Sequence, residues 1–303
     1  MFFISVLSIL GVAAFFVHRR RLDLRRRYAS RYAVVTGATG GVGQALCDEL
    51  IKQGFRIISI SRSAGDGHTT PSVLGLSYNL DGSETTPFAE RFSAFLKQHG
   101  IDQLEIGFVA HVAGYGEFCR FEETTLAHKR SLINCNLVLP IELSDYFYKG
   151  FAQRGKRGDR SAMVFISSCL ALHPGPHFAL YHTTKAAISA LASALYIEGA
   201  SLGIDILAVH PGTIRGSGFF RRPEMHMDKL PSSRRLGHTW LLSSTPADVV
   251  RVITRYLGLC CHVHTGPTAY ATVLLHALVP KSLVCHVLSF PHRLTRRSSE
   301  LAQ

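Results

Sequence analysis

The feature that most constrains the fold is a run of small residues between a short apolar stretch and an amphipathic one. Residues 32–35 are apolar and lie between charged residues and this run, which predicts a buried strand. An apolar stripe over residues 42–53 predicts a helix. A strand, a glycine turn and a helix in this order are typical of a βαβ unit that binds a pyrophosphate at the helix N-terminus. The residues predicted to bind it are Gly37, Thr39, Gly40, Gly41, Val42 and Gly43.

Predicted strands and helices alternate along the rest of the chain. Further strands are expected at residues 56–60, 74–78, 106–111, 162–167 and 204–209, with a last one after Gly266. Helices are expected at residues 88–98, 126–151 and 181–202, and another beginning at residues 245–248. This order predicts an α/β fold: a single Rossmann-type, doubly wound parallel sheet with helices on both faces. The predicted domain covers residues 32–275, and 276–303 form an apolar and basic tail.

The first 31 residues predict a membrane anchor followed by a basic juxtamembrane segment. Residues 2–17 form an uninterrupted apolar run, and arginines begin at residue 19. A transmembrane helix needs roughly 17–25 apolar residues, so this run is a short span. The basic residues follow the run instead of preceding it, which favours an uncleaved anchor with the following domain in the cytosol. A helix lying in the membrane interface is the alternative.

The net charge of +12 is concentrated near the two ends of the chain. Residues 19–31 hold seven arginines and one aspartate, and the tail from Lys281 onward is also basic. Basic ends beside apolar segments favour a membrane surface over a nucleic acid as partner. The seven cysteines show no disulfide framework, so reduced thiols are expected. The ligands in the segment 260–264 are too crowded for a tetrahedral site, so no metal is predicted.

The end of the second expected strand indicates which dinucleotide is bound. An acidic residue there would select a free ribose 2′-hydroxyl, but the sequence has Ser61 and Arg62. A cationic Arg62 favours a 2′-phosphate, so NADP(H) is predicted over NAD(H). The alternative for Arg62 is a solvated surface side chain.

A third pattern carries the predicted chemistry. Tyr181 and Lys185 are four residues apart, which places them on one face of a helix, and Ser168 ends the strand before it. Together with the glycine turn, this order and spacing resemble the short-chain dehydrogenase/reductase family over about residues 32–275.

The resemblance implies catalytic roles for four residues. Tyr181 would be the general acid in ketone reduction, and a cationic Lys185 would lower its pKa and contact the nicotinamide ribose. Ser168 would orient the substrate carbonyl. Asn136, in preference to Asn134, matches the asparagine that holds a water in the family's proton relay.

Other positions match the family's cofactor contacts less closely. His111 and Val112 stand where the family has two asparagines, and Gly216 stands where a threonine often follows the sixth strand. The remaining implied cofactor residues are Asn79, Ala113, Gly114, Pro211, Gly212 and Ile214.

Within the family, the chain is most similar to membrane-anchored hydroxysteroid dehydrogenases and very-long-chain β-ketoacyl-CoA reductases. The resemblance implies an NADPH-dependent reductase of a lipid-like ketone at the endoplasmic reticulum, assembled as a homodimer or homotetramer. Two alternatives stay open: an oxidising steroid or retinol dehydrogenase, and a membrane-tethered module that binds NADP(H) without turnover. The tail after Gly266 is either part of the core or docked on the membrane.

Overall fold

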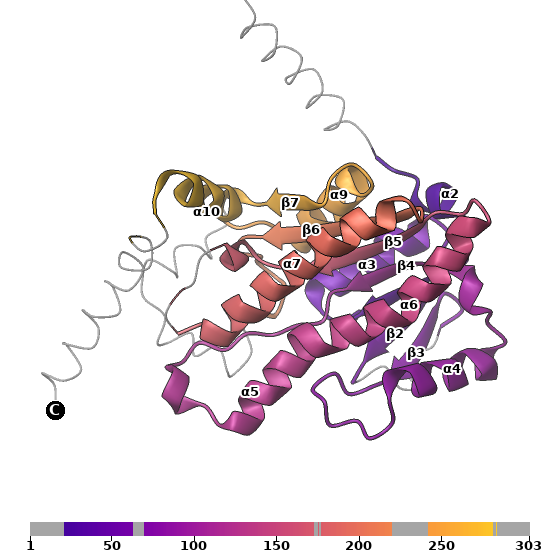
Figure 1. Ribbon diagram of the computed structural model, residues 1–303, viewed down its shortest axis with the longest axis horizontal. Helices are drawn as coiled ribbons and strands as arrows, with labels where there is room; N and C mark the ends of the chain where they lie inside the picture. The colour runs from indigo at the N-terminus through magenta and orange to yellow at the C-terminus, as the bar shows by residue number, and fades with distance from the viewer. Residues whose placement is uncertain are drawn as a thin grey trace, which may run out of the picture.

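The computed structural model describes residues 21–62, 70–172, 175, 177–219, 242–280 and 283. Within these ranges the chain forms one seven-stranded sheet in the order β3-β2-β1-β4-β5-β6-β7 (Figure 1). The strands are β1 (Tyr32–Thr36), β2 (Arg56–Ser61), β3 (Val73–Ser77), β4 (Ile106–His111), β5 (Ser161–Ile166), β6 (Ile204–Pro211) and β7 (His262–Thr265). Every neighbouring pair is parallel, which confirms the predicted Rossmann-type sheet.

The central strands are buried on both faces. Each residue of β1, β4 and β6 is buried. Strands that are covered on both sides need apolar residues at successive positions, and this explains why they appear in the sequence as short apolar runs without alternation.

Two layers of helices cover the sheet. One face packs against α4 (Phe88–His99), α5 (Leu126–Ile133), α6 (Leu139–Lys156) and α7 (Ala179–Ala200), and the other against α2 (Leu24–Tyr28), α3 (Gly41–Lys52) and α9 (Pro246–Tyr256). Phe92 and Phe147 are fully buried on the first face, and Leu46 and Ile253 on the second. The three layers place the amino ends of the strands at one edge of the molecule and their carboxyl ends at the other.

The helix expected over residues 126–151 is interrupted. A π-helical segment, Asn134–Val138, joins α5 to α6. Such a segment holds one extra residue per turn, and it changes which side chains of the helix face the sheet.

The position predicted for the last strand was wrong. β7 ends at Thr265, and Gly266, with φ of 90°, turns the chain into α10 (Pro267–Leu278). The apolar residues after Gly266 are helical because Pro267 is pre-organised for the first turn of a helix. β7 alternates exposed or half-buried histidines with buried residues, so its apolar signal is weak.

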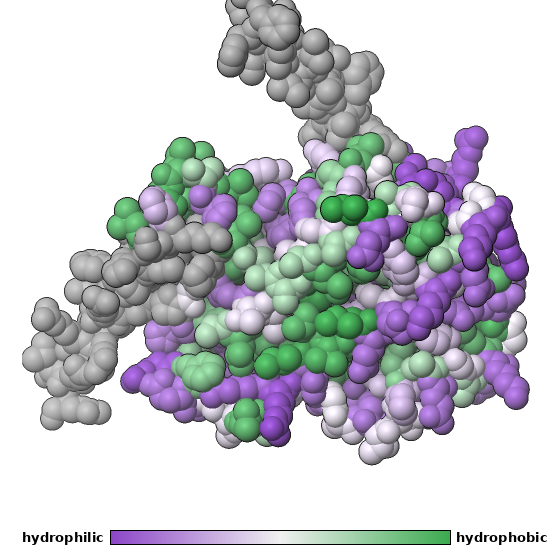
Figure 2. Space-filling view, viewed as in Figure 1, coloured by the Kyte–Doolittle hydropathy of each residue, from purple (hydrophilic) through white to green (hydrophobic). Residues whose placement is uncertain are grey.

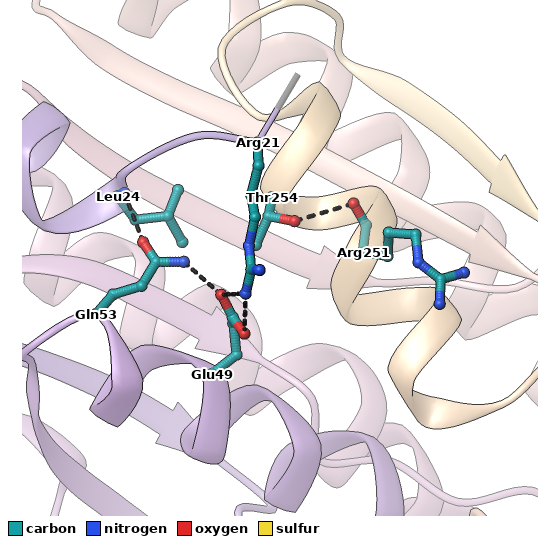
Figure 3. Close-up of polar contacts among 6 residues, drawn as sticks. All are labelled: Arg21, Leu24, Glu49, Gln53, Arg251 and Thr254. Atoms are coloured by element: carbon teal, nitrogen blue, oxygen red, sulfur yellow. Dashed lines mark hydrogen bonds and ion pairs between the residues drawn. The ribbon is translucent and has the colours of Figure 1, made fainter. Parts of the chain in front are cut away.

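The segment before β1 packs against the domain. Asp23 caps α2 by accepting a hydrogen bond from the backbone N–H of Arg26, and Leu24 and Tyr28 are fully buried. Figure 3 shows Arg21 paired with Glu49 of α3 at 2.7 Å. Part of the basic segment that was predicted to lie at a membrane surface therefore contacts the domain, since Arg21 and Arg27 form ion pairs with it.

The predicted anchor, residues 2–17, lies outside the described residues. Among the residues that the structure describes, no helix has the length and apolar character to cross a bilayer. Residues 220–241 and most of the tail after residue 280 also lie outside these ranges.

Candidate active site

A cavity of about 880 Å³ opens at the carboxyl ends of the strands. Its walls come from the segments that follow β1, β2, β4, β5 and β6 and from α7 and α10. In an open parallel sheet, ligands bind at this edge, where the strand order reverses between β1 and β4.

The glycine turn after β1 forms one end of the cavity. Gly37 has φ of 66°, and a Cβ atom there would lie 2.8 Å from the Cα of Ala113. A Cβ on Gly43 would lie 2.1 Å from the carbonyl oxygen of Gly37. The turn therefore requires glycine at both positions.

The N-terminus of α3 offers an anion site at this turn. Gly40 caps the helix without a side-chain hydrogen bond, and the first turn contains no acidic residue. The positive end of the helix dipole and its first N–H groups face the cavity that Gly40, Gly41 and Val42 line. These features fit the pyrophosphate of a dinucleotide.

The end of β2 supplies a second polar group. Ser61 is buried, and its Oγ has no hydrogen-bond partner among the described residues. A buried hydroxyl without a partner costs free energy, so a ligand that bonds to it is favoured. The exposed Arg62 lies beside it on the cavity wall. Both residues fit a ribose that carries a phosphate.

The four predicted catalytic residues come together from three segments. Tyr181 and Lys185 lie on one face of α7 and are 8% and 5% exposed. The Nζ of Lys185 lies 5.6 Å from the centroid of the Tyr181 ring and donates a hydrogen bond to the carbonyl of Ile166 at 2.8 Å. Ser168 follows β5 and hydrogen-bonds to the Tyr181 side chain.

Asn136 lies behind this group and does not line the cavity. Its Nδ2 donates to the carbonyl of Tyr115 at 2.8 Å, and its Oδ1 accepts from the Tyr115 N–H at 3.0 Å. A Cβ atom on Gly114 would lie 3.1 Å from both Asn136 Oδ1 and Lys185 Nζ, so these two side chains meet over a glycine. Asn134 instead donates to the carbonyl of Asp81.

Burial shifts the pKa values of the catalytic pair. Desolvation raises the pKa of Tyr181 above its ordinary value, and the hydrogen bond from Ser168 opposes this in part. Desolvation also lowers the pKa of Lys185 to about 8, so its amine is still mostly cationic at neutral pH. Burial, and not the charge of Lys185 that the resemblance implies, has the largest effect on the pKa of Tyr181.

The other end of the cavity is apolar. Phe178 and Phe219 line this wall, and Phe219 packs on the Tyr181 ring with centroids 5.5 Å apart. Phe118 belongs to the same cluster but does not line the cavity. Leu275 of α10 also lines the cavity. This wall fits an apolar substrate beside the Tyr181 hydroxyl.

The remaining sequence predictions divide between the cavity and its surroundings. Gly37, Thr39, Gly40, Gly41, Val42, Gly43, Ser61, Arg62, Ala113, Gly114, Pro211, Gly212 and Ile214 all line it. Asn79 does not: its Nδ2 donates to Ser83, and Leu80 and Asp81 line the wall in its place.

Sequence reasoning missed several residues that hold the site. The Oγ1 of Thr36 accepts from the N–H groups of Val112 and Ala113, both at 3.1 Å, and so fixes the segment after β4. Thr268 accepts from the N–H of Thr213 at 2.8 Å. Thr36 ends its strand and could have been suspected, but nothing local in the sequence pairs Thr268 with Thr213.

The crowded segment 260–264 makes other contacts. The Sγ of Cys261 donates to the carbonyl of Ala192, and His262 hydrogen-bonds to His210 at 2.9 Å. Across the described part of the chain, no group of three histidine, cysteine or carboxylate side chains could hold a metal ion.

The chain matches a sequence model for short chain dehydrogenases over residues 31–224. A 7beta-hydroxysteroid dehydrogenase of Mediterraneibacter gnavus is 25% identical over 253 residues, which are 83% of this chain and 92% of that protein. A very-long-chain 3-oxoacyl-CoA reductase of Mus musculus is 31% identical over 189 residues, covering 59% of this chain and 58% of the relative.

Solved structures share the fold at lower identity. A structure of a 7beta-hydroxysteroid dehydrogenase is 20% identical with a TM-score of 0.70, and covers 88% of this chain and 100% of that one. A short chain dehydrogenase from Burkholderia cenocepacia J2315 in complex with NADP is 18% identical with a TM-score of 0.63, and covers 84% and 96%.

Proposed function

Because the chain belongs to the short-chain dehydrogenase/reductase family and is an NAD(P)-dependent oxidoreductase, we propose that it uses NADPH to reduce a ketone on a lipid-like substrate. The observation that carries this proposal is the position of Tyr181 between two different walls. The glycine turn and the α3 N-terminus lie on one side of it, and the apolar cluster with Phe178 and Phe219 lies on the other.

The side chains around Tyr181 support a reduction. NADPH, when bound, supplies a hydride to the carbonyl carbon. The Tyr181 phenol, which burial keeps protonated, donates its proton to the carbonyl oxygen. Ser168 donates a hydrogen bond that orients the same oxygen. The cationic Lys185 stabilises the phenolate that forms on Tyr181, and Asn136 holds the segment at Gly114 beside Lys185.

Two observations support the substrate class. The cavity wall beside Tyr181 is aromatic and aliphatic, which favours a steroid or acyl chain over a polar metabolite. The names of the relatives point the same way, since they include hydroxysteroid dehydrogenases and 3-oxoacyl-CoA reductases.

The experiment is NADPH oxidation by the purified protein with long-chain β-ketoacyl-CoAs, ketosteroids and retinal. We expect turnover with one of these classes and a loss of about 100-fold or more in kcat for Tyr181→Phe, because phenylalanine has no proton to donate. Tyr146→Phe is the matched control, since its hydroxyl bonds to Ser93 away from the cavity. NADPH binding without turnover of any compound would contradict the proposal and favour a non-catalytic module.

The preference for NADPH over NADH is a separate part of the proposal. It is supported by Arg62 on the cavity wall and by the unsatisfied Oγ of Ser61. Arg62→Ala should raise the KM for NADPH by about 10-fold or more and leave the KM for NADH nearly unchanged, because only NADPH carries the 2′-phosphate. Equal changes in the two constants would remove Arg62 from this role.

We further propose that the protein is anchored at the endoplasmic reticulum with this domain in the cytosol. The apolar run 2–17 and the arginines that follow it support this orientation. A glycosylation acceptor fused after Gln303 should therefore stay unmodified in cells, and efficient glycosylation would contradict the topology.

A further inference from the structure

Three histidines lie together beneath the active site. The pairing of β6 with β7 sets His210 opposite His264 and brings His262 next to both. The rings of His210 and His264 are 4.8 Å apart, and those of His210 and His262 are 5.1 Å apart. None of the three lines the cavity.

Two of these histidines belong to a chain of hydrogen bonds that ends at the active site. The Oγ of Ser193, on α7, lies 2.7 Å from Nε2 of His262. Nδ1 of His262 lies 2.9 Å from Nε2 of His210, and Nδ1 of His210 lies 3.1 Å from the carbonyl oxygen of Ser168. The chain therefore runs from the surface to a residue that touches Tyr181.

The carbonyl of Ser168 decides where the protons lie. A carbonyl only accepts hydrogen bonds, so Nδ1 of His210 must carry the hydrogen. Nε2 of a neutral His210 is then an acceptor, and Nδ1 of His262 must donate to it. Nε2 of His262 is then an acceptor as well. The single hydrogen of the Ser193 hydroxyl has two acceptors within reach, Nε2 of His262 at 2.7 Å and the carbonyl of Ser189 at 3.0 Å, and this order of donors requires it to go to His262. The opposite set of tautomers would place two acceptors face to face at Ser168.

Burial supports neutral imidazoles in this chain. His210 is 2% exposed, and desolvation lowers its pKa to about 4. Desolvation also lowers the pKa of His262. Both rings are therefore neutral at physiological pH, which the tautomer argument requires.

The carbonyl of Ser168 begins the turn that aims the Ser168 hydroxyl. It also accepts a hydrogen bond from the N–H of Ala171 at 3.0 Å, and the Ser168 Oγ accepts from the N–H of Leu170 at 3.1 Å. These two bonds close the turn on itself. The bond from His210 is different, because it ties the turn to β6.

We propose that His210 is a positioning residue for Ser168, and that His262 and Ser193 select the tautomer of His210 that can hold the Ser168 carbonyl. The proposal deepens the function proposed above and rests on it for the role of Ser168. It predicts that removing the His210 bond lowers kcat without weakening NADPH binding, since the glycine turn is at the other end of the cavity.

The first test needs no substrate. Long-range ¹H–¹⁵N NMR of protein labelled on histidine should find the Nδ1–H tautomer for both His210 and His262, assigned by loss of their signals in single variants. In Ser193→Ala the ¹⁵N signals of His262 should shift more than those of His210, because the substitution removes the group that bonds to Nε2 of His262. A hydrogen on Nε2 of His210 in the unmodified protein would overturn the proposal.

The second test uses the substrate found in the NADPH assay. His210→Leu should lower kcat by about 10-fold, while the KM for NADPH changes by less than about twofold. His210→Asn should restore most of the rate, because its amide can donate from nearly the same place as Nδ1. His264→Asn is the control. It changes a ring that packs on His210 but keeps the bond from His210 to Ser168, so kcat should stay nearly unchanged.

The outcomes separate this proposal from the function itself. Equal losses in the leucine and asparagine variants would indicate a packing role and overturn the positioning role, even with Tyr181→Phe inactive. If no compound is turned over, the proposed function fails, while the NMR tautomers still decide the hydrogen-bond chain.

Discussion

Burial has two opposite effects on Lys185: it brings the amine to its contacts in the site, and it makes the positive charge of the amine less stable. Its amine must be buried to reach Ile166 and the Tyr181 ring, yet burial lowers its pKa to about 8. The charge that stabilises the Tyr181 phenolate is therefore close to being lost at mildly alkaline pH.

This gives a pH prediction for catalysis. Lys185 is cationic below pH about 8 and neutral above it, so kcat/KM for reduction should fall as the pH rises through about 8. In Lys185→Arg the residual activity should lack this fall, because a guanidinium stays charged. Lys149→Arg, on the exposed surface of α6, should keep the fall of the unmodified enzyme. The same alkaline fall in Lys185→Arg would exclude Lys185 as its source.

His111 is a buried residue with consequences for stability. Its ring stacks on Phe165 at 4.6 Å, and its Nε2 donates to the Oγ of Ser144, whose own hydrogen goes to Pro140. Burial lowers its pKa from 6.5 to about 3. As the pH falls below 6.5, His111 becomes protonated in the unfolded chain but stays neutral in the folded protein. The free energy of unfolding therefore decreases.

The free energy of unfolding should accordingly decrease by up to about 1.4 kcal/mol per pH unit below pH 6.5 through this group alone. His111→Leu should remove that part of the slope in urea unfolding at pH 5 and pH 7, leaving the contribution of His210. His99→Leu, at the exposed end of α4, is the control. An unchanged slope in His111→Leu would show that His111 is protonated in the folded protein.

Residues that act through local spacing could be predicted from the sequence. Tyr181 and Lys185 need only one helical turn, and the glycines need only one strand and one helix around them. The residues missed, such as Thr268 and Leu275, reach the site through contacts between segments that are far apart in the chain. The residues next to them in the sequence do not indicate these contacts, because it is the pairing of β6 with β7 that brings the two segments together.

At the scale of elements, α2 acts as a clamp on the amino edge of the sheet. Asp205 of β6 is 5% exposed, and its carboxylate accepts from Arg27 Nε at 2.9 Å and from the Tyr28 hydroxyl at 3.0 Å. Arg160 reaches the same carboxylate from the segment before β5. Asp205 of β6 thus joins α2 to the segment that precedes β5.

Asp205→Asn should therefore destabilise the protein by about 2 kcal/mol or more, because it leaves two guanidinium groups without their buried counter-charge. Thermal unfolding measures the effect. Asp145→Asn, which breaks an exposed pair with Lys149, should cost less than about 0.5 kcal/mol. Similar losses in the two variants would mean that α2 contributes little to the fold.

Element prediction succeeded where apolar periodicity was strong. The strand expected at residues 106–111 matches β4, and the expected helix start at Thr245 is the cap of α9. It missed α2, whose five residues include three arginines, since two buried side chains make too short a signal. It also misplaced β7, because histidines occupy alternate positions of that strand.

At the scale of the whole molecule, α10 has two different faces. Thr268, Thr272 and Leu275 line the cavity, whereas Tyr270 and Leu274 are each 60% exposed. Figure 2 shows hydrophobic side chains gathered over this helix. The helix closes the cavity on one side, so residues up to 278 belong functionally with the domain.

Two truncations test this. A chain ending after Thr265 should lose at least about tenfold in NADPH affinity, because Thr268 no longer holds the N–H of Thr213 and the cavity loses a wall. A chain ending after Pro280 should bind NADPH as the full chain does. Fluorescence titration compares the two. Equal affinities would show that the turn after β6 holds its shape without α10.

The π-helical segment at residues 134–138 makes the position of Asn136 depend on chain length. In an α-helix each residue turns the chain by about 100°, so deleting one residue here would rotate Asn136 away from Gly114. If a related chain lacks the extra residue of this segment, a correct alignment of the two chains contains a gap here. A gap-free alignment with a chain that lacks this residue would then shift the register by one and pair Cys135 or Leu137, not Asn136, with the corresponding position.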